Sequence, residues 1–251
     1  KNIDNLMFAG RNISASHVAF SSTRVMGTIG VIGQAVGTAA AIATKYDLLP
    51  RDAAQTKIDE IQAALLEDDC FLPGLRREIS PLAKKANISC DYGDCSNLLN
   101  GLDRRIWGND NGYFGKTNKS ITYTFDQPQF VNGVRLVMDS DLDREYTGGI
   151  KEQIDALKSH GMTHLEPRGL DEGNISLYTV EQAKKLKEIL DENGQWDTAL
   201  EITNNHQRFV KHALNKIVKA VRFTPLSTYH SETKTEDYGS STAHLFNFEV
   251  Y

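Results

Sequence analysis

The chain carries no excess of positive charge. Its 251 residues contain 28 lysines and arginines against 33 aspartates and glutamates, which gives a formal net charge of -5 with histidine neutral. Proteins that bind nucleic acid or anionic membrane surfaces without specificity need clustered positive charge. The composition therefore predicts no nucleic-acid partner.

Long apolar runs are also missing. A membrane-spanning helix needs roughly 18–20 consecutive apolar residues. The longest candidate, residues 29–43, is interrupted by Gly33, Gln34, Gly37 and Thr38. We therefore predict no membrane span. No secretory signal peptide is visible, and the sequence leaves the location open between cytoplasm, periplasm and secretion.

Cysteine is scarce, with only Cys70, Cys90 and Cys95. The C-x4-C spacing of the last two permits a small disulfide loop in an oxidising compartment, and a pair of reduced thiols fits it equally well. Paired His and Cys residues at zinc-ligand spacing are absent. No metal site is predicted.

The dinucleotide-binding fingerprint G-x-G-x-x-G occurs nowhere in the chain. In proteins that use it, its glycines let the backbone approach a pyrophosphate, and an acidic residue further on holds a ribose. Neither element can be assigned here. The sequence therefore predicts no complete site of that kind.

What the chain does have is an unusual beginning, residues 5–44. A short apolar stretch, residues 6–9, predicts a buried strand that stops at Gly10, and a polar loop follows. Next comes a predicted helix containing Gly27, Gly30, Gly33 and Gly37. Each glycine costs a helix about 1 kcal/mol relative to alanine. We therefore predict a close approach to its backbone, by another helix or by a flat ligand over the helix start, where free N–H groups favour an electron-rich or anionic group.

Strand, A-G-R turn, loop, Arg24-Val25 and the G-Q-A-x-G-x-A-A helix occur here in the order seen in a known family. The segment resembles the C-terminal flavin segment of FAD-dependent oxidoreductases of the fumarate reductase/succinate dehydrogenase flavoprotein type. More closely, it is similar to the bacterial group labelled xanthan lyase-like. The resemblance implies FAD as cofactor and hydride transfer to or from a small organic substrate.

That family opens with a strand, a G-x-G-x-x-G turn and a helix that hold the ADP part of FAD. Because this unit is missing, we expect the chain to be a C-terminal fragment that does not hold FAD alone. Its expected partner is the N-terminal remainder of the same flavoprotein.

The resemblance also implies site residues. Arg24 takes the place of an arginine near the substrate carboxylate and the flavin, as a clamp or proton source, and a purely structural ion pair is the alternative. His17 is a second catalytic candidate, although its spacing from Arg24 differs from the family pattern. The expected cofactor contacts are Gly10, Arg11 and the first backbone N–H groups of the glycine helix, those of Val25, Met26, Gly27 and Thr28.

The pattern changes after about residue 69. Residues 1–69 form the expected end of the FAD-binding domain, with a second helix from Pro50 onward, and residues 70–84 form an expected linker. Residues 85–251 contain several short stretches of alternating apolar and polar residues bounded by turns, which favour an antiparallel β-sandwich. The predicted fold class is α+β: a strand–helix segment of a Rossmann-like FAD domain followed by a jelly roll.

The second half resembles a galactose-binding-like (discoidin, F5/8 type C) jelly roll. The matching pieces are the N-x-x-x-G-L-D-R turn, a predicted hairpin in S-I-T-Y-T-F-D-Q-P and the closing strand H-L-F-N-F-E-V-Y. Residues 149–194 do not fit a sandwich, because residues 150–160 and 180–193 show helical patterns with Thr179 as a capping residue. We expect a helical insertion there.

In such a sandwich, loops at one end carry the ligand site, and Trp107, Tyr113 or Tyr146 would stack on a sugar. The alternative function is accordingly a non-catalytic carbohydrate-binding or protein-interaction module. Asp139, Asp141 and Asp143 alternate as in a calcium loop but lack its glycine and its final acid, so we expect a solvated loop.

Overall fold

The computed structural model describes residues 3–106, 109–139, 185–190, 195–202, 205, 207–226 and 242–251. The chain divides into two compact units, Lys1–Glu78 and Ile79–Tyr251, so the division falls within residues 70–84. Residues 149–184 of the expected insertion lie outside the described residues.

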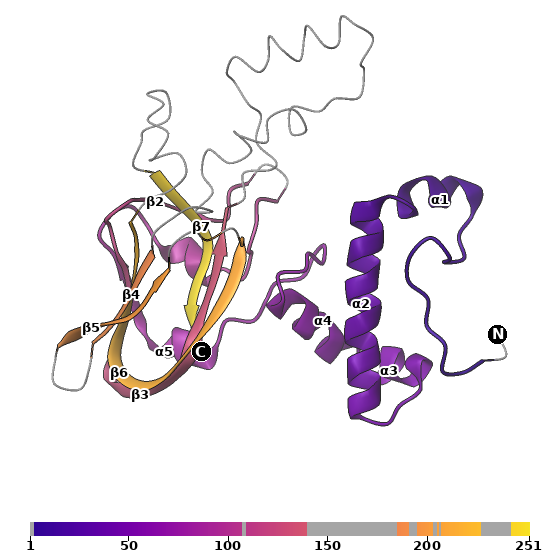
Figure 1. Ribbon diagram of the computed structural model, residues 1–251, viewed down its shortest axis with the longest axis horizontal. Coiled ribbons are helices and arrows are strands. Elements are labelled where there is room, and N and C mark those ends of the chain that lie inside the picture. Colours follow the sequence, from indigo (N-terminus) through magenta and orange to yellow (C-terminus); the bar gives the residue numbers. More distant parts are fainter. Residues whose placement is uncertain are drawn as a thin grey trace, which may run out of the picture. The chain divides into compact units, whose positions relative to one another are not determined.

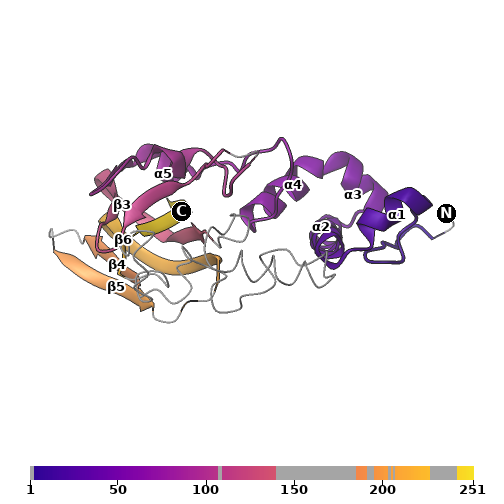
Figure 2. The same ribbon diagram turned by 90° about the horizontal axis from the view of Figure 1, so that it is seen from above.

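The first unit is helical (Figure 1). Its long helix packs against two shorter ones (Figures 1 and 2), and the four helices are α1 (His17–Thr23), α2 (Met26–Lys45), α3 (Pro50–Thr56) and α4 (Ile58–Glu67). The predicted glycine helix is thus confirmed as α2. The C-terminal half of α2 packs against α4 in a small apolar core that contains Ile42, Ile61, Leu65 and Cys70.

Two local predictions for this unit are wrong. The expected loop contains α1, which forms because the hydroxyl of Ser16 accepts the N–H of Ala19 and caps the helix. The expected strand at residues 6–9 is not present, and Phe8 is 53% exposed. A strand must satisfy its backbone groups against a neighbouring strand. The described part of this unit offers none.

Helix α2 bears on the prediction that the chain has no membrane span. It has 20 residues and a mean hydropathy of 1.5, and 11% of its apolar 18-residue stretch is buried. By length and composition it could therefore cross a membrane. The sequence prediction required an uninterrupted apolar run. Glycine and threonine interrupt such a run, but they do not make a helix strongly polar. A single helix near the N-terminus is weak evidence for a span.

In its described residues, the second unit is an antiparallel sheet of seven strands. Its strand order is β2-β7-β3-β6-β4-β5, with β1 paired to β3. The strands are β1 (Asn87–Cys90), β2 (Tyr113–Lys116), β3 (Ile121–Met138), β4 (Lys185–Leu190), β5 (Trp196–Ile202), β6 (Phe209–Pro225) and β7 (Thr242–Val250). Together with the helical first unit, this antiparallel β-structure confirms the predicted α+β fold class.

The central strand β3 is continuous where the sequence predicted a hairpin. Asp126 and Pro128 lie inside it, and the pairing with β6 shifts register between Thr124 and Gln129. The irregularity lets the strand bend and tolerates a proline that a regular ladder would not. The turn-forming residues therefore produce a bend in one long strand.

The predicted helix at residues 180–193 is also wrong over its described part. Residues 185–190 form β4, which pairs with both β5 and β6. The stretch K-L-K-E-I-L has helical spacing and charges, but two flanking strands provide backbone partners on both sides. Tertiary pairing here overrides local propensity.

Ser80 caps helix α5 (Pro81–Lys85) and connects the start of this unit to its last strand by hydrogen bonds. The Ser80 hydroxyl caps α5 by accepting the N–H of Ala83 and donates to the carbonyl of Val250 at 2.6 Å. The Ser80 N–H donates to the carboxylate of Glu249 at 2.8 Å. The 3-10 helix η1 (Ser96–Leu99) packs against β7 through the fully buried Leu98.

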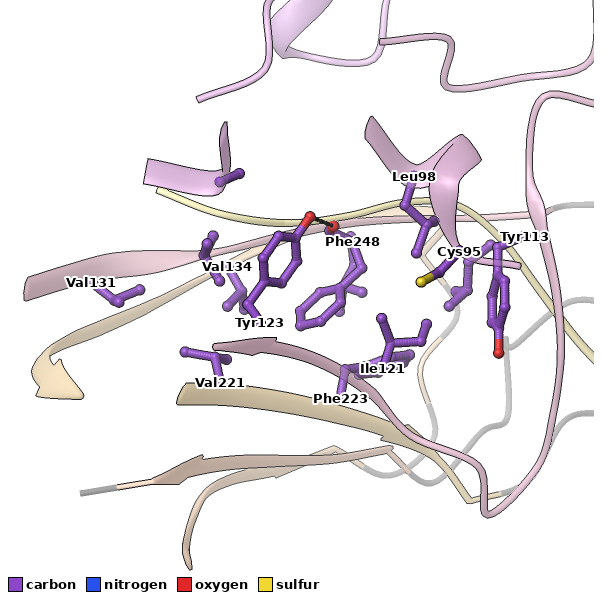
Figure 3. Packing of buried hydrophobic residues seen from close by; sticks show 14 of the residues in the cluster. Cys95, Leu98, Tyr113, Ile121, Tyr123, Val131, Val134, Val221, Phe223 and Phe248 are labelled. Carbon is purple, nitrogen blue, oxygen red and sulfur yellow. Dashed lines mark hydrogen bonds between the residues drawn. The ribbon is translucent and has the colours of Figure 1, made fainter. Parts of the chain in front are cut away.

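The core of the second unit lies between its bent strands (Figure 3). Tyr123 is fully buried in it, and its hydroxyl donates to the carbonyl of Phe248 at 2.8 Å, while the two rings meet edge to face at 5.3 Å. The core residues drawn with it come from β2, β3, β6, β7 and η1 and include Cys95, Leu98, Tyr113, Ile121, Val131, Val134, Val221 and Phe223.

Replacing Tyr123 by phenylalanine tests the value of this buried hydrogen bond. We expect Tyr123→Phe to lower the free energy of unfolding by about 1–3 kcal/mol, because the Phe248 carbonyl loses its side-chain donor. Tyr92→Phe, at an exposed tyrosine of the same unit, should change it by less than about 0.5 kcal/mol. Urea denaturation measures both, and equal effects would contradict the expectation.

Candidate functional site

The start of α2 is an open helix end. Its N-cap residue Val25 makes no side-chain capping bond, and the first turn contains no acidic residue. Met26 is 88% exposed. The first N–H groups of a helix have no partner within the helix and carry the positive end of its dipole. This end is therefore suited to an electron-rich or anionic group.

The glycines of α2 line an open face. At Gly27, Gly30, Gly33 and Gly37 an added Cβ would meet no atom within 4 Å. The predicted close approach of another helix to these glycines is therefore not found within the described part of the chain. The helix instead uses Ala35 and Ala39 to pack toward the small core.

Gly10 lies beside the first turns of α2. It has a positive φ of 98°, and an added Cβ would lie 3.9 Å from the Cγ2 atom of Ile29. The structure thus brings Gly10 close to the helix that begins after Val25, as the resemblance implies. Arg11 follows Gly10 with an exposed side chain.

His17 and Arg24 lie at the two ends of α1, and both are exposed. Seven residues along a helix correspond to about 10 Å, so the structure does not bring the two into one hydrogen-bonded pair. Arg24 ends α1 and immediately precedes Val25, which places it next to the open end of α2. Of the two, Arg24 is better placed for a ligand at that helix end.

These features fit the pyrimidine edge of a flavin ring. Backbone N–H groups at residues 25–28 can donate to its carbonyl oxygens, and the glycine face leaves room for a flat ring. Arg24 adds a positive charge nearby. The fit concerns only this edge, because the sequence offers no group for the ADP part.

In the second unit, the predicted sugar-stacking residues receive little support. Trp107 and Tyr146 lie outside the described residues. Tyr113 is only 2% exposed, and its hydroxyl donates to the carbonyl of Tyr92 at 2.5 Å. Its ring belongs to the core, so the prediction that it stacks on a sugar is wrong.

A buried charged cluster, which the sequence did not predict, lies around His244 on β7. The Nδ1 atom of His244 lies 2.6 Å from a carboxylate oxygen of Asp139, and Nε2 lies 3.1 Å from one of Asp110. The ring of Phe114 stacks on the imidazole at 4.0 Å with an angle of 18°. Asp139 is buried, so the expectation that it belongs to a solvated loop is wrong, while Asp141 and Asp143 lie outside the described residues.

Opposing influences act on the charges of this cluster. Burial lowers the pKa of His244, but hydrogen bonds and charge from Asp110 and Asp139 outweigh it and raise the pKa above its ordinary value. Burial would raise the pKa of Asp110, whereas His244, the N–H of Gly112 and Arg105 lower it strongly. The folded protein thus favours a charged imidazole between two carboxylates.

A neighbouring ion pair is equally buried. The guanidinium of Arg135 lies 2.9 Å from the carboxylate of Asp103 and donates to the side-chain oxygen of Asn247 at 3.0 Å. Removing one member of such a pair is costly, because it leaves a buried charge without compensation. This pair anchors the turn around Asp103 to the sheet.

The two close cysteines are thiols in this structure. Cys90 is half-buried and donates to the carbonyl of Gly93, and Cys95 is buried. Burial and a hydrogen bond with Cys90 raise the pKa of Cys95 to about 12. The Cys95 thiol is therefore poorly reactive at neutral pH, since the thiolate is the nucleophile.

Alkylation under native conditions tests this difference. With iodoacetamide at pH 8, Cys90 should be labelled faster than Cys95, and peptide mass spectrometry measures both. In urea, the two should react at similar rates. Recovery of both cysteines unalkylated and joined by a disulfide unless reductant is added would contradict the thiol state.

Comparison with solved structures returns carbohydrate-binding modules. The family 32 module of Streptococcus pneumoniae EndoD has 13% identity and a TM-score of 0.42, covering 68% of this chain and 99% of that one. A fucose binding module of Streptococcus pneumoniae has 10% identity and a TM-score of 0.43, covering 72% and 98%. Chitosan-binding module 1 of a Paenibacillus sp. IK-5 chitosanase/glucanase has 14% and 0.39, covering 68% and 97%. At such low identities and TM-scores, the ligands of these modules say nothing about a ligand of this chain.

No curated protein matches the chain. Residues 1–65 match the family model "FAD dependent oxidoreductase", in agreement with the resemblance seen in the sequence. The match includes α1, α2, α3 and most of α4. The first 65 residues are thus similar to the FAD dependent oxidoreductase family, and an antiparallel β-sheet unit follows them.

Proposed function

We propose that this chain is part of an FAD-dependent oxidoreductase that acts on a small organic substrate. The observation that carries the proposal is the open, glycine-lined start of α2 within the segment that matches the family model. Each glycine costs the helix about 1 kcal/mol relative to alanine, and a flat ligand lying close to this face would account for their presence.

In this proposal each residue has a stated task. The backbone N–H groups of Val25, Met26, Gly27 and Thr28 hold the pyrimidine edge of the ring, and Gly10 keeps the preceding loop close to α2. Arg24 orients a substrate carboxylate by paired hydrogen bonds. His17 lies farther from the start of α2, about 10 Å from Arg24 along α1. It would contact the substrate and not the flavin ring.

Bound FAD would supply the hydride chemistry, and the protein supplies position and charge. A dipole end and a guanidinium on the same side of the ring favour negative charge there. The ADP part requires a separate binding region, with which this segment would assemble through its exposed apolar side chains, among them Phe8, Val18, Val25 and Met26.

Absorption spectroscopy of the natural full-length protein tests the proposal. It should purify with a bound flavin, recognisable by its visible absorption bands. A protein that purifies colourless and takes up no FAD on titration would refute the proposal.

Alanine at the glycine positions separates flavin contact from helix stability. Gly27→Ala and Gly30→Ala should raise the free energy of unfolding by up to about 1 kcal/mol, because nothing described lies near the added Cβ. They should nevertheless weaken FAD binding about tenfold, since an extra methyl group against a packed ligand costs about 1–3 kcal/mol.

Gly37→Ala is the matched control. It lies about 15 Å along the helix from Gly27, has the same open surroundings, and should stabilise the helix without changing FAD affinity. Equal FAD affinity for all three variants would contradict a ring at the helix start. Calorimetric titration of the full-length protein with FAD measures this.

Glycan binding by the β-sheet unit is a second candidate, and one side chain favours it. Trp196 begins the edge strand β5 and is 39% exposed, and the guanidinium of Arg222 lies 4.0 Å from its ring centroid. An exposed indole flanked by a donor-rich cation offers both the apolar face and the hydrogen bonds that a sugar uses.

Replacing this indole tests the second candidate. If the unit binds a glycan, Trp196→Ala should weaken binding at least about tenfold, as expected for an aromatic anchor. Phe130→Ala, at an aromatic residue 53% exposed elsewhere on the unit, serves as control and should leave binding unchanged. A glycan array with the intact chain gives the ligand, and absence of any binding would reject this candidate.

A further inference from the structure

His244 is enclosed by apolar surfaces on two sides. The Phe114 ring of β2 stacks on it at 4.0 Å, and the Phe246 ring, two residues further along β7, meets it edge-on at 4.8 Å. The imidazole is fully buried. Water therefore cannot serve as the hydrogen-bonding partner of its ring nitrogens.

The partners of those nitrogens come from two separate elements. Asp139 directly follows β3, and its backbone N–H also donates to the carbonyl of His244 at 3.3 Å. Asp110 lies in the loop before β2, where it also accepts the N–H of Gly112 at 2.8 Å and faces Arg105 at 3.1 Å. The histidine side chain thus joins the end of β3 to the segment Asp110–Gly112 of the loop before β2.

Gly112 lets this loop lie close to the ring. An added Cβ would lie 2.4 Å from Nε2 of His244 and 2.8 Å from the carbonyl oxygen of Leu245. Any other residue would force the loop away from β7. The close approach is therefore built into the loop sequence.

The protonation chemistry of imidazole then decides the state of the cluster. A neutral imidazole has one N–H donor and one acceptor, and a carboxylate is only an acceptor. Since a carboxylate faces each nitrogen, only the doubly protonated ring donates to both. A neutral ring would direct a lone pair at one buried carboxylate oxygen, which is unfavourable in a low-dielectric site.

We propose that His244 is a doubly protonated clasp that holds the Asp110–Gly112 segment and the end of β3 on β7, and that loss of one proton releases this segment, so that the clasp responds to alkaline pH.

The direction of the response follows from the groups that face the ring. Asp110 and Asp139 face its two nitrogens, Arg105 faces the far side of Asp110, and Arg208 lies over the Phe246 ring at 5.1 Å. The pKa of His244 is raised on folding. Its stabilising contribution is therefore complete below the unfolded-state value of 6.5 and is lost as pH rises through the higher folded-state value.

Long-range proton–nitrogen NMR of the full chain tests the clasp directly. At neutral pH both ring nitrogens of His244 should carry protons, and on raising the pH one should be lost in a single step above the ordinary histidine pKa of about 6.5. Amide signals of Asp110, Asn111 and Gly112 should shift with the same midpoint. A nitrogen without a proton at neutral pH would overturn the proposal, and so would loop signals that do not follow the titration.

Variants distinguish a clasp from a merely buried histidine. Asp110→Asn and Asp139→Asn should each lower the His244 titration midpoint by about 1–3 pH units, because each removes a negative charge in hydrogen-bond contact. Asp126→Asn, at an exposed carboxylate of the same unit, should leave it unchanged. If a variant fails to fold, the wild-type titration still decides, and midpoints unchanged in folded variants would refute the proposal.

Discussion

The pairing of β3 with two neighbours is the constraint on which the rest of the second unit depends. β3 pairs with β6 from Ile121 to Val137 and with β7 from Val134 to Met138. This double pairing brings together segments more than a hundred residues apart in the chain, such as Tyr123 and Phe248. Both the core and the buried charges around His244 depend on it, because the core contains side chains of β3 and β7, and the cluster joins His244 of β7 to Asp139, which directly follows β3.

The first unit has the opposite character. Its core contains few buried side chains, whereas the start of α2, its glycines and several large apolar residues remain exposed. A small core supplies little stability, so additional contacts are the physical requirement of this segment. The same surface that needs covering is the one that would contact a flavin, which makes assembly and cofactor binding one event in the proposed function.

Several features could be predicted from the sequence because their causes are local. Small residues at helical spacing gave the position of α2, and alternation of apolar and polar residues indicated the strands that became β1, β3, β6 and β7. The flavoprotein segment could be recognised because its motif is contiguous. The predicted strand ends were wrong where turn-forming residues lie in a strand that pairs strongly with its neighbours. Pro128, for example, lies inside β3 and does not end it.

The sequence by itself therefore determined the two-part organisation, the glycine helix and the flavin-type segment, since all three are written in neighbouring residues. Only the tertiary structure decided that residues 185–190 are a strand, that residues 6–9 are not, and that Tyr113 belongs to the core. It also assembled Asp110, Asp139 and His244, which no spacing pattern connects. The physical reason is that backbone pairing and burial depend on partners that are distant in the chain.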